Sequence, residues 1–353
     1  MTFLELAETL EQTGAESVPP YRVEQIFSWI SRGALSFDRM TDLPQAWRRE
    51  LAGRFSIRGS RVSGRLDDPD GTSKLRFTLT DGAVIEAVLL ASEKTGPDRE
   101  PGRSYTACLS TQAGCPVGCV FCKTGSLGFL RNLDTFELTD QFLALSDLVR
   151  ERNGGSCRIS HIVVMGMGEP LLNLAALRKA LAILCDPRGF GFSKRRITIS
   201  TSGIRAGILE LAEQGPEAEL ALSLTTARED LRRRLMPGAG ENSLEDLKEA
   251  LKIYQEKTGR RITLEAVLLG GINTGAGDAR ALAAFAKGLK AAVNLIPWNP
   301  VPGLSFGGEK IREPPAAETG RFRRLLEQEG IQVTGRYRRG RGISGACGQL
   351  AGS

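Results

Sequence analysis

The sequence is poor in histidine, the side chain that most often binds metals. It contains one histidine, His161, among 353 residues. A single imidazole cannot supply the paired histidines of many zinc sites. His161 also lies in an apolar run that predicts a strand, so we expect a core residue rather than a metal ligand.

Long apolar runs and targeting signals are also missing. No stretch of about 18 apolar residues occurs, so no membrane-spanning helix is expected. The first residues, MTFLELAETLEQTG, are amphipathic and acidic, without the basic segment and apolar core of a signal peptide. We therefore expect a cytoplasmic protein with no membrane partner.

The composition favours a folded protein with a large core. Apolar residues make up 41% of the chain, and its length allows one large α/β unit with a small appendage. The net charge of +6 is compatible with a polyanionic partner. Short basic clusters occur at 194–196 and 336–341, and the second interleaves a tyrosine with arginines, which suits contact with nucleic acid.

Seven cysteines in a chain without a secretion signal argue against a disulfide framework. Cys157 and Cys185 have apolar neighbours and are predicted to be small core residues. The other five stand at Cys108, at Cys115, Cys119 and Cys122, and at Cys347 near the C-terminus.

The chain divides into four predicted parts. Helical spacing of apolar residues fills 1–58, and residues 59–104 read as a β-hairpin followed by a polar loop, with Asp81-Gly82 as a two-residue turn. From 105 to 335 short strands alternate with helices, one of them predicted over 276–291. Residues 336–353 form a tail.

Alternation of strands and helices predicts a parallel sheet with helical crossovers. About six such units favour a partial (βα)6 barrel of the TIM type, with a doubly wound sheet as the alternative. In both architectures ligands bind at the carboxyl ends of the strands.

Cys115, Cys119 and Cys122 follow the first strand of this region with the spacing C-x3-C-x2-C. Three thiolates can ligate three irons of a [4Fe–4S] cluster, which leaves the fourth iron open to chelation by S-adenosylmethionine. The alternatives are a zinc site with Cys108 as fourth thiolate and an ordinary cysteine-rich loop.

A glycine-rich turn, Gly166-Met167-Gly168-Glu169-Pro170, ends the next predicted strand. Glycines allow the backbone to approach a ligand closely. A carboxylate at a strand end, such as Glu169, could accept a hydrogen bond from the amino group of the cofactor.

These motifs together resemble the radical S-adenosylmethionine RNA methyltransferases of the RlmN and Cfr family, over nearly the whole chain. The matching segments are 21–30, 108–133, 166–173, 192–203, 294–300 and 345–350. The resemblance implies an RNA-binding N-terminal domain at 1–58 and a radical SAM barrel at 105–335.

The resemblance also implies a reaction that uses two S-adenosylmethionine molecules. The first methylates Cys347, and a 5′-deoxyadenosyl radical from the second removes hydrogen from that methyl group. The carbon radical adds to adenine, Glu86 accepts the ring proton, and Cys108 releases the product by forming a disulfide with Cys347.

By the same resemblance, the cofactor contacts are Gly168, Glu169, Ser200, Ser223, Leu224, Thr225 and Asn299. The family usually has histidine where this chain has Thr225, and loop 92–104 looks longer than usual. The implied partners are 23S rRNA, tRNA and a flavodoxin- or ferredoxin-like electron donor, for a monomeric enzyme.

RlmN-type methylation at adenine C2 is the leading hypothesis. Cfr-type methylation at C8 and a non-catalytic metal-bearing RNA-binding protein are the alternatives.

Overall fold

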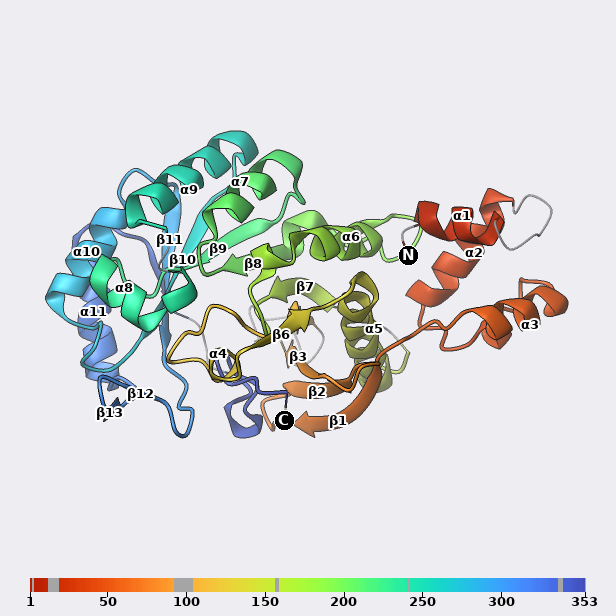
Figure 1. Ribbon diagram of the computed structural model, residues 1–353, viewed down its shortest axis with the longest axis horizontal. Coiled ribbons are helices and arrows are strands. Elements are labelled where there is room, and N and C mark those ends of the chain that lie inside the picture. Colours follow the sequence, from red (N-terminus) through yellow and green to blue (C-terminus); the bar gives the residue numbers. More distant parts are fainter. Residues whose placement is uncertain are drawn as a thin grey trace.

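A ten-stranded mixed sheet organises the chain in the computed structural model (Figure 1). The structure describes residues 1, 3–11, 19–91, 104–155, 159–239, 242–335 and 339–352. The strand order is β1-β2-β3-β4-β7-β8-β9-β10-β11-β14.

The strands from β4 to β14 are parallel and lie side by side in chain order: β4 (Tyr105–Cys108), β7 (Ile159–Val164), β8 (Ile197–Thr201), β9 (Glu219–Ser223), β10 (Ile262–Leu268), β11 (Ala291–Pro297) and β14 (Val333–Gly335). The main connecting helices are α5 (Thr135–Arg152), α6 (Leu174–Cys185), α7 (Arg205–Gln214), α9 (Leu244–Thr258), α10 (Ala276–Ala286) and α11 (Ala316–Gln328). Right-handed crossovers in an unreversed strand order place helices on one face of the sheet, as in a partial barrel. The doubly wound alternative is wrong, because it requires a reversal of strand order.

Three antiparallel strands extend this sheet at β4. They are β1 (Arg61–Asp67), β2 (Ser73–Thr78) and β3 (Val84–Ala91). The predicted hairpin is present, but its turn has three residues, because the Leu79 amide donates to the Ala83 carbonyl over 2.9 Å. Gly82 makes this turn possible with φ of 86°.

The N-terminal helices have a core of their own. They are α1 (Phe3–Glu11), α2 (Pro20–Ser31) and α3 (Gln45–Arg54), with a 3-10 turn η1 (Phe37–Arg39). Their buried residues pack on one another, and Ile183 of α6 is the one buried residue of this cluster from outside the N-terminal segment, within the described chain. Helical structure before residue 58 is as predicted, whereas the four domain boundaries stay predictions.

The remaining elements are short. They are β5 (Gln112–Gly114), α4 (Lys123–Ser126), β6 (Phe129–Asn132), α8 (Glu229–Leu235), β12 (Ser305–Phe306), β13 (Glu309–Lys310), and the 3-10 turns η2 (Pro170–Leu172), η3 (Lys194–Arg196), η4 (Pro237–Ala239) and η5 (Arg341–Ile343).

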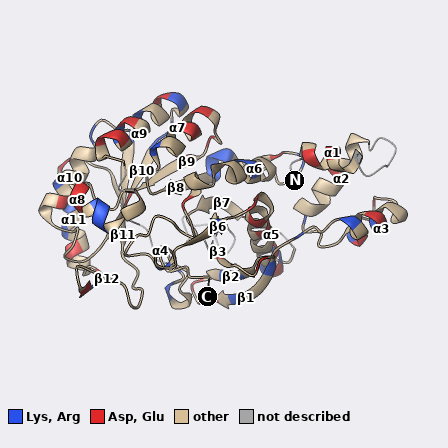
Figure 2. Cartoon of the chain, in the orientation of Figure 1, with Lys and Arg blue, Asp and Glu red and all other residues tan. Residues whose placement is uncertain are grey.

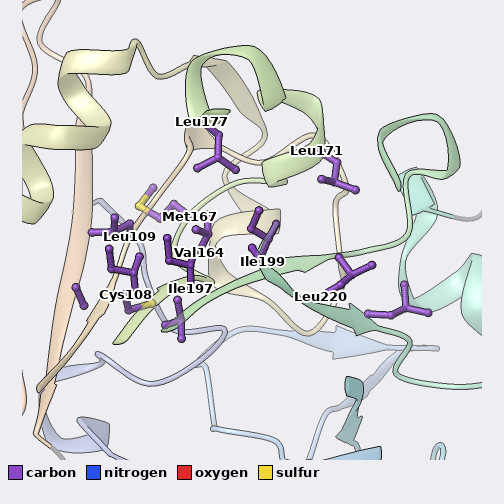
Figure 3. Close-up of a cluster of buried hydrophobic side chains, with 14 of the residues drawn as sticks. Cys108, Leu109, Val164, Met167, Leu171, Leu177, Ile197, Ile199 and Leu220 are labelled. Carbon is purple, nitrogen blue, oxygen red and sulfur yellow. The ribbon is translucent and has the colours of Figure 1, made fainter. Parts of the chain in front are cut away.

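The main core lies where the parallel strands meet their helices. Figure 3 shows part of it, with Cys108 and Val164 among leucine and isoleucine side chains. Charged residues gather instead on the outer faces of helices such as α7, α9 and α10 (Figure 2). No helix among the described residues is long and apolar enough to cross a membrane.

Some sequence expectations need correction. His161 is exposed rather than buried, because it precedes the buried half of β7. The helix predicted over 276–291 ends at Ala286, since Gly288 turns the chain with φ of 82° and Ala291 already begins β11. Cys185 packs against the core but is half-buried. Cys157, residues 92–103 of the polar loop and 336–338 of the basic cluster lie outside the described residues.

Tyr254 gives a test of the packing in this fold. Its side chain is fully buried on α9, and its hydroxyl donates to the Ala218 carbonyl over 2.7 Å. Tyr254→Phe leaves that carbonyl without its donor, so we expect a loss of about 1–2 kcal/mol in the free energy of unfolding. The matched change Tyr21→Phe, at a side chain that is 53% exposed, is expected to have no measurable effect. Equal urea midpoints for the two variants would contradict this packing.

Candidate active site

The three cysteines of the C-x3-C-x2-C motif lie on a tightly folded loop after β5. The Cys115 amide donates to the Gly128 carbonyl over 2.8 Å, and the Cys122 amide donates to the Cys119 carbonyl over 3.1 Å. Gly114 has φ of 75°, and a Cβ there would come within 2.0 Å of the Gly128 oxygen. Only glycine fits this turn, which brings the cysteines together beside the strand ends.

One pocket at the carboxyl ends of the parallel strands collects most of the predicted site residues. The pocket is partly open to solvent, and its lining combines apolar side chains with a few polar ones, as is typical of a ligand site. The predicted residues that line it are Cys115, Cys119, Cys122, Gly168, Glu169, Ser200, Ser223, Thr225, Asn299 and Cys347. Leu224, Glu86 and Cys108 are not among its lining residues.

Burial keeps the three thiols protonated in the protein alone. Burial raises the pKa of Cys115 to about 12, and it raises the pKa of Cys119 and of Cys122 as well, with further increases from neighbouring acidic groups. Such thiols become thiolates when a metal centre supplies positive charge.

A single zinc ion fits this site poorly. Within the described part of the chain, no three His, Cys, Asp or Glu side chains converge where one ion could bind. Cys108, the fourth thiolate of the zinc alternative, is buried at the end of β4 and does not line the pocket. A cubane binds its three thiolates on three different irons, so it does not require them to converge on one ion.

Glu169 lies beside the cysteines as a buried acceptor. Its carboxylate accepts hydrogen bonds from the Thr201 hydroxyl (2.7 Å), the Ser202 amide (2.6 Å) and the Leu171 amide (3.0 Å). Burial raises the pKa of Glu169, and these hydrogen bonds oppose that rise by stabilising the ionised form. Gly168, with φ of 101°, brings this turn against Gln112, where a Cβ would come within 2.6 Å of the Gln112 Cβ.

Two buried polar atoms in the pocket fit a polar cofactor. Thr225 Oγ1 and Asn299 Oδ1 have no hydrogen-bond partner among the described residues. Thr225 also has φ of 61°, a left-handed conformation that is costly for a β-branched residue. Its amide donates to the Glu265 carbonyl over 3.0 Å, and its carbonyl accepts from Asn273 over 3.0 Å, which hold it in place.

Glu265 is a pocket residue that sequence reasoning missed. It lies on β10, is 5% exposed, and accepts a hydrogen bond from the Ser200 hydroxyl over 3.0 Å. In sequence it is the one charged residue of a mostly apolar strand, which usually marks an outward face. Glu265 lies at the pocket because it pairs with Ser223 of the neighbouring strand β9, and this pairing cannot be read from the sequence.

The C-terminal tail brings Cys347 to this pocket. The Asn299 side-chain Nδ2 donates to the Cys347 carbonyl (3.0 Å), the Lys123 backbone amide to the Gly348 carbonyl (2.8 Å), and the Thr124 hydroxyl to the Leu350 carbonyl (2.7 Å). The tail therefore lies directly on the loop that carries the three cysteines. The Cys347 residue is exposed, whereas its neighbours Ala346 and Leu350 are buried.

Glu86 and Cys108 lie on the same face of two neighbouring strands. Cys108 of β4 stands opposite Val88 of β3, and Glu86 is two residues from Val88, so all three side chains share that face. Glu86 is 1% exposed and accepts a hydrogen bond from the Ala351 amide of the tail over 2.9 Å. The tail thus connects the Cys347 pocket with the strands that carry the other two predicted catalytic residues.

The fold and the cysteine pocket define the class of protein, a radical SAM enzyme. The pattern of the radical SAM superfamily matches residues 109–279. A radical SAM methyltransferase from Sphaerobacter thermophilus has a crystal structure that superposes with a TM-score of 0.90 at 40% identity, covering 100% of this chain and 98% of that one.

Curated relatives specify the family. The probable dual-specificity RNA methyltransferase RlmN of Treponema pallidum (strain Nichols) is 47% identical over 94% of this chain and 91% of its own length. The proteins of the same name from Treponema denticola and Thermus thermophilus are 48% and 41% identical, each over 94% of this chain and 89% of their own length. The chain therefore belongs to the RlmN family, and it is an S-adenosylmethionine-dependent radical RNA methyltransferase.

Proposed function

We propose that this enzyme methylates C2 of an adenosine in 23S rRNA near the peptidyl transferase centre, and the adenosine 3′ to the anticodon in tRNAs. The observation that carries the proposal is the position of Cys347, which lines the same pocket as Cys115, Cys119 and Cys122. The name of the relatives, dual-specificity RNA methyltransferase, supports two classes of RNA substrate.

Cys115, Cys119 and Cys122 would hold a [4Fe–4S] cluster, and Glu169, Ser200, Thr225 and Asn299 would bind S-adenosylmethionine, two molecules per turnover. When bound and reduced by a flavodoxin- or ferredoxin-like donor, these groups supply a methyl group and a carbon radical, which side chains alone do not provide.

The remaining steps belong to side chains of this chain. The Cys347 sulfur carries the methyl carbon to the adenine, and the Glu86 carboxylate accepts the ring proton after the new carbon–carbon bond has formed. The Cys108 sulfur then attacks the Cys347 sulfur. The S–S bond forms and the bond from that sulfur to the transferred carbon breaks. The carbon keeps the electron pair and takes up a proton, equal in number to the one lost by the Cys108 thiol, which completes the methyl group of the product.

Nucleoside mass spectrometry tests the proposed regiochemistry. The reconstituted enzyme is incubated anaerobically with reductant, S-adenosylmethionine, and either 23S rRNA or tRNA, and the digested nucleosides are compared with standards. We expect 2-methyladenosine from both RNAs. The appearance of 8-methyladenosine instead would favour the Cfr-type reaction, and no methylated adenosine from an active cluster would favour a binding protein.

Glu265 offers a test of cofactor binding in the pocket. A buried carboxylate beside two serine hydroxyls suits the hydroxyl groups of a ribose, which donate hydrogen bonds. We expect Glu265→Gln to weaken S-adenosylmethionine binding about tenfold in equilibrium dialysis, because a charge-assisted hydrogen bond becomes a neutral one. The matched change Glu329→Gln, at a surface ion pair with Lys287, should leave binding unchanged. If the two variants bind S-adenosylmethionine equally well, Glu265 does not contact the cofactor.

A further inference from the structure

Both ends of the loop that carries Cys347 bind one buried ion pair. Lys74 Nζ lies 2.9 Å from Glu86 Oε1, and the two side chains are 8% and 1% exposed. The Lys74 ammonium also donates to the Ser344 carbonyl over 3.4 Å, before Cys347. After Cys347, the Ala351 amide donates to the second oxygen of Glu86 over 2.9 Å. The ion pair therefore contacts the chain on both sides of Cys347, at Ser344 and at Ala351.

A buried ion pair of this kind is a weak source of stability. Removing two charges from water costs several kcal/mol per ion, and an apolar pair of similar volume is often as stable. Lys74 and Glu86 lie on adjacent strands, β2 and β3, which already share a ladder of backbone hydrogen bonds. Besides forming this ion pair, the Lys74 ammonium and the Glu86 carboxylate each make a hydrogen bond with the tail. The arrangement thus indicates a role in holding the tail rather than the hairpin.

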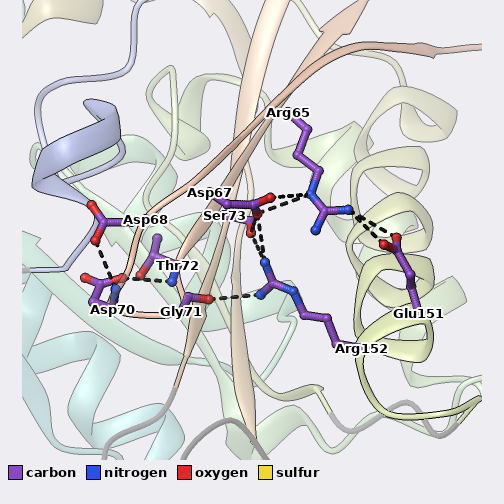
Figure 4. Close-up of polar contacts among 9 residues, drawn as sticks. All are labelled: Arg65, Asp67, Asp68, Asp70, Gly71, Thr72, Ser73, Glu151 and Arg152. Carbon is purple, nitrogen blue, oxygen red and sulfur yellow. Dashed lines mark hydrogen bonds and ion pairs between the residues drawn. The ribbon is translucent and has the colours of Figure 1, made fainter.

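The turn between β1 and β2, which precedes Lys74, also binds the tail. Asp68 and Asp70 at the β1–β2 turn accept hydrogen bonds from the Gly342 amide (3.0 Å) and the Gly340 amide (2.9 Å). Figure 4 shows these two carboxylates on the side of the turn toward the blue C-terminal segment.

The opposite side of this turn is anchored to the barrel. Arg152 of α5 donates to the Gly71 carbonyl over 2.9 Å and to Asp67 over 2.8 Å (Figure 4). The β1–β2 turn is therefore fixed to α5 of the barrel on one side and bound to the tail on the other.

We propose that the Lys74–Glu86 pair is a latch that fixes the Cys347 loop over the pocket, and that Lys74 is a positioning residue for Cys347. Lys74 acts through the Ser344 carbonyl and through Glu86. A change in the charge of Glu86 weakens both attachments at once. If Glu86 accepts the ring proton, as the proposed function holds, proton transfer also loosens the loop so that its cysteine can reach Cys108. That consequence rests on the proposed function, whereas the latch does not.

Hydrogen–deuterium exchange of the RNA-free holoenzyme tests the latch without any turnover. We expect Lys74→Met to raise exchange in peptides covering 344–351 about tenfold, since the loop loses a charge-assisted hydrogen bond at one end and the fixed carboxylate at the other. Lys74→Arg keeps the charge and should restore most of the protection. The matched control Lys287→Met removes an exposed ion pair and should leave the tail unchanged.

Ala351→Pro approaches the latch from the tail. It removes the amide that donates to Glu86 but leaves the hairpin intact, so exchange should rise in 344–350 and not in β2 or β3. If Lys74→Met raises exchange across the whole hairpin, Ala351→Pro still tests the contact with the tail separately from the stability of the hairpin. Exchange within twofold of wild type in 344–350 for Ala351→Pro would overturn the latch. A failed methylation assay with intact exchange effects would instead count against the proposed function alone.

Discussion

Cys347→Ala is expected to reduce RNA methylation at least about a thousandfold, to the limit of detection, because the sulfur that carries the methyl group is gone. Iron content and the visible absorbance of the cluster should stay at the wild-type level. The reason is that Cys347 lies on the tail, whereas the three predicted ligands lie on the loop at 115–122. Nucleoside mass spectrometry and iron analysis of the same preparation measure both effects.

The matched control for this variant is Cys185→Ala. Cys185 ends α6, is half-buried, and is not among the residues that line the pocket. It should retain wild-type methylation. Methylation by Cys347→Ala at a comparable rate would show that the methyl group does not pass through this thiol.

Cys108→Ala should behave differently and trap RNA on the enzyme. Without the second thiol, the carbon bonded to the Cys347 sulfur cannot be released, so the RNA stays covalently attached. We expect a slowly migrating RNA–protein band on a denaturing gel and a fall of about a hundredfold or more in released product.

The position of Cys108 supports this separation of effects. It lies on the same strand face as Glu86 and outside the lining of the pocket, so its loss should leave the earlier steps intact. The band should disappear in the double variant that also carries Cys347→Ala. Normal turnover by Cys108→Ala, with no band, would contradict the release step.

The local parts of the site were predictable from sequence, because the residues that form each of them lie close together in the chain. The spacing of Cys115, Cys119 and Cys122 indicates the cluster without reference to the rest of the chain. The glycine-rich turn before Glu169 is likewise local, and its close approach to Gln112 explains the need for glycine at 168. Parallel strand order followed from the regular alternation of strands and helices.

Contacts between distant segments were not predictable. Lys74 and Ser344 are 270 residues apart, and neither has a sequence signal that pairs it with the other. Glu265 is a mid-strand polar residue whose inward position depends on register. Strand β1 was missed because Arg61–Asp67 is a largely exposed segment without alternating apolar residues. His161 was misjudged because periodicity does not locate where a strand becomes buried.

The most direct test of the central claim is to detect the methyl group on Cys347 itself. The holoenzyme is incubated with S-adenosylmethionine that carries a deuterated methyl group, and trypsin cleavage after Arg341 releases the peptide 342–353 for mass spectrometry. The proposed route predicts a deuterated methyl group on Cys347 before RNA is added, and its loss once RNA is methylated. Labelled RNA from an enzyme whose Cys347 peptide never carries the label would contradict the claim.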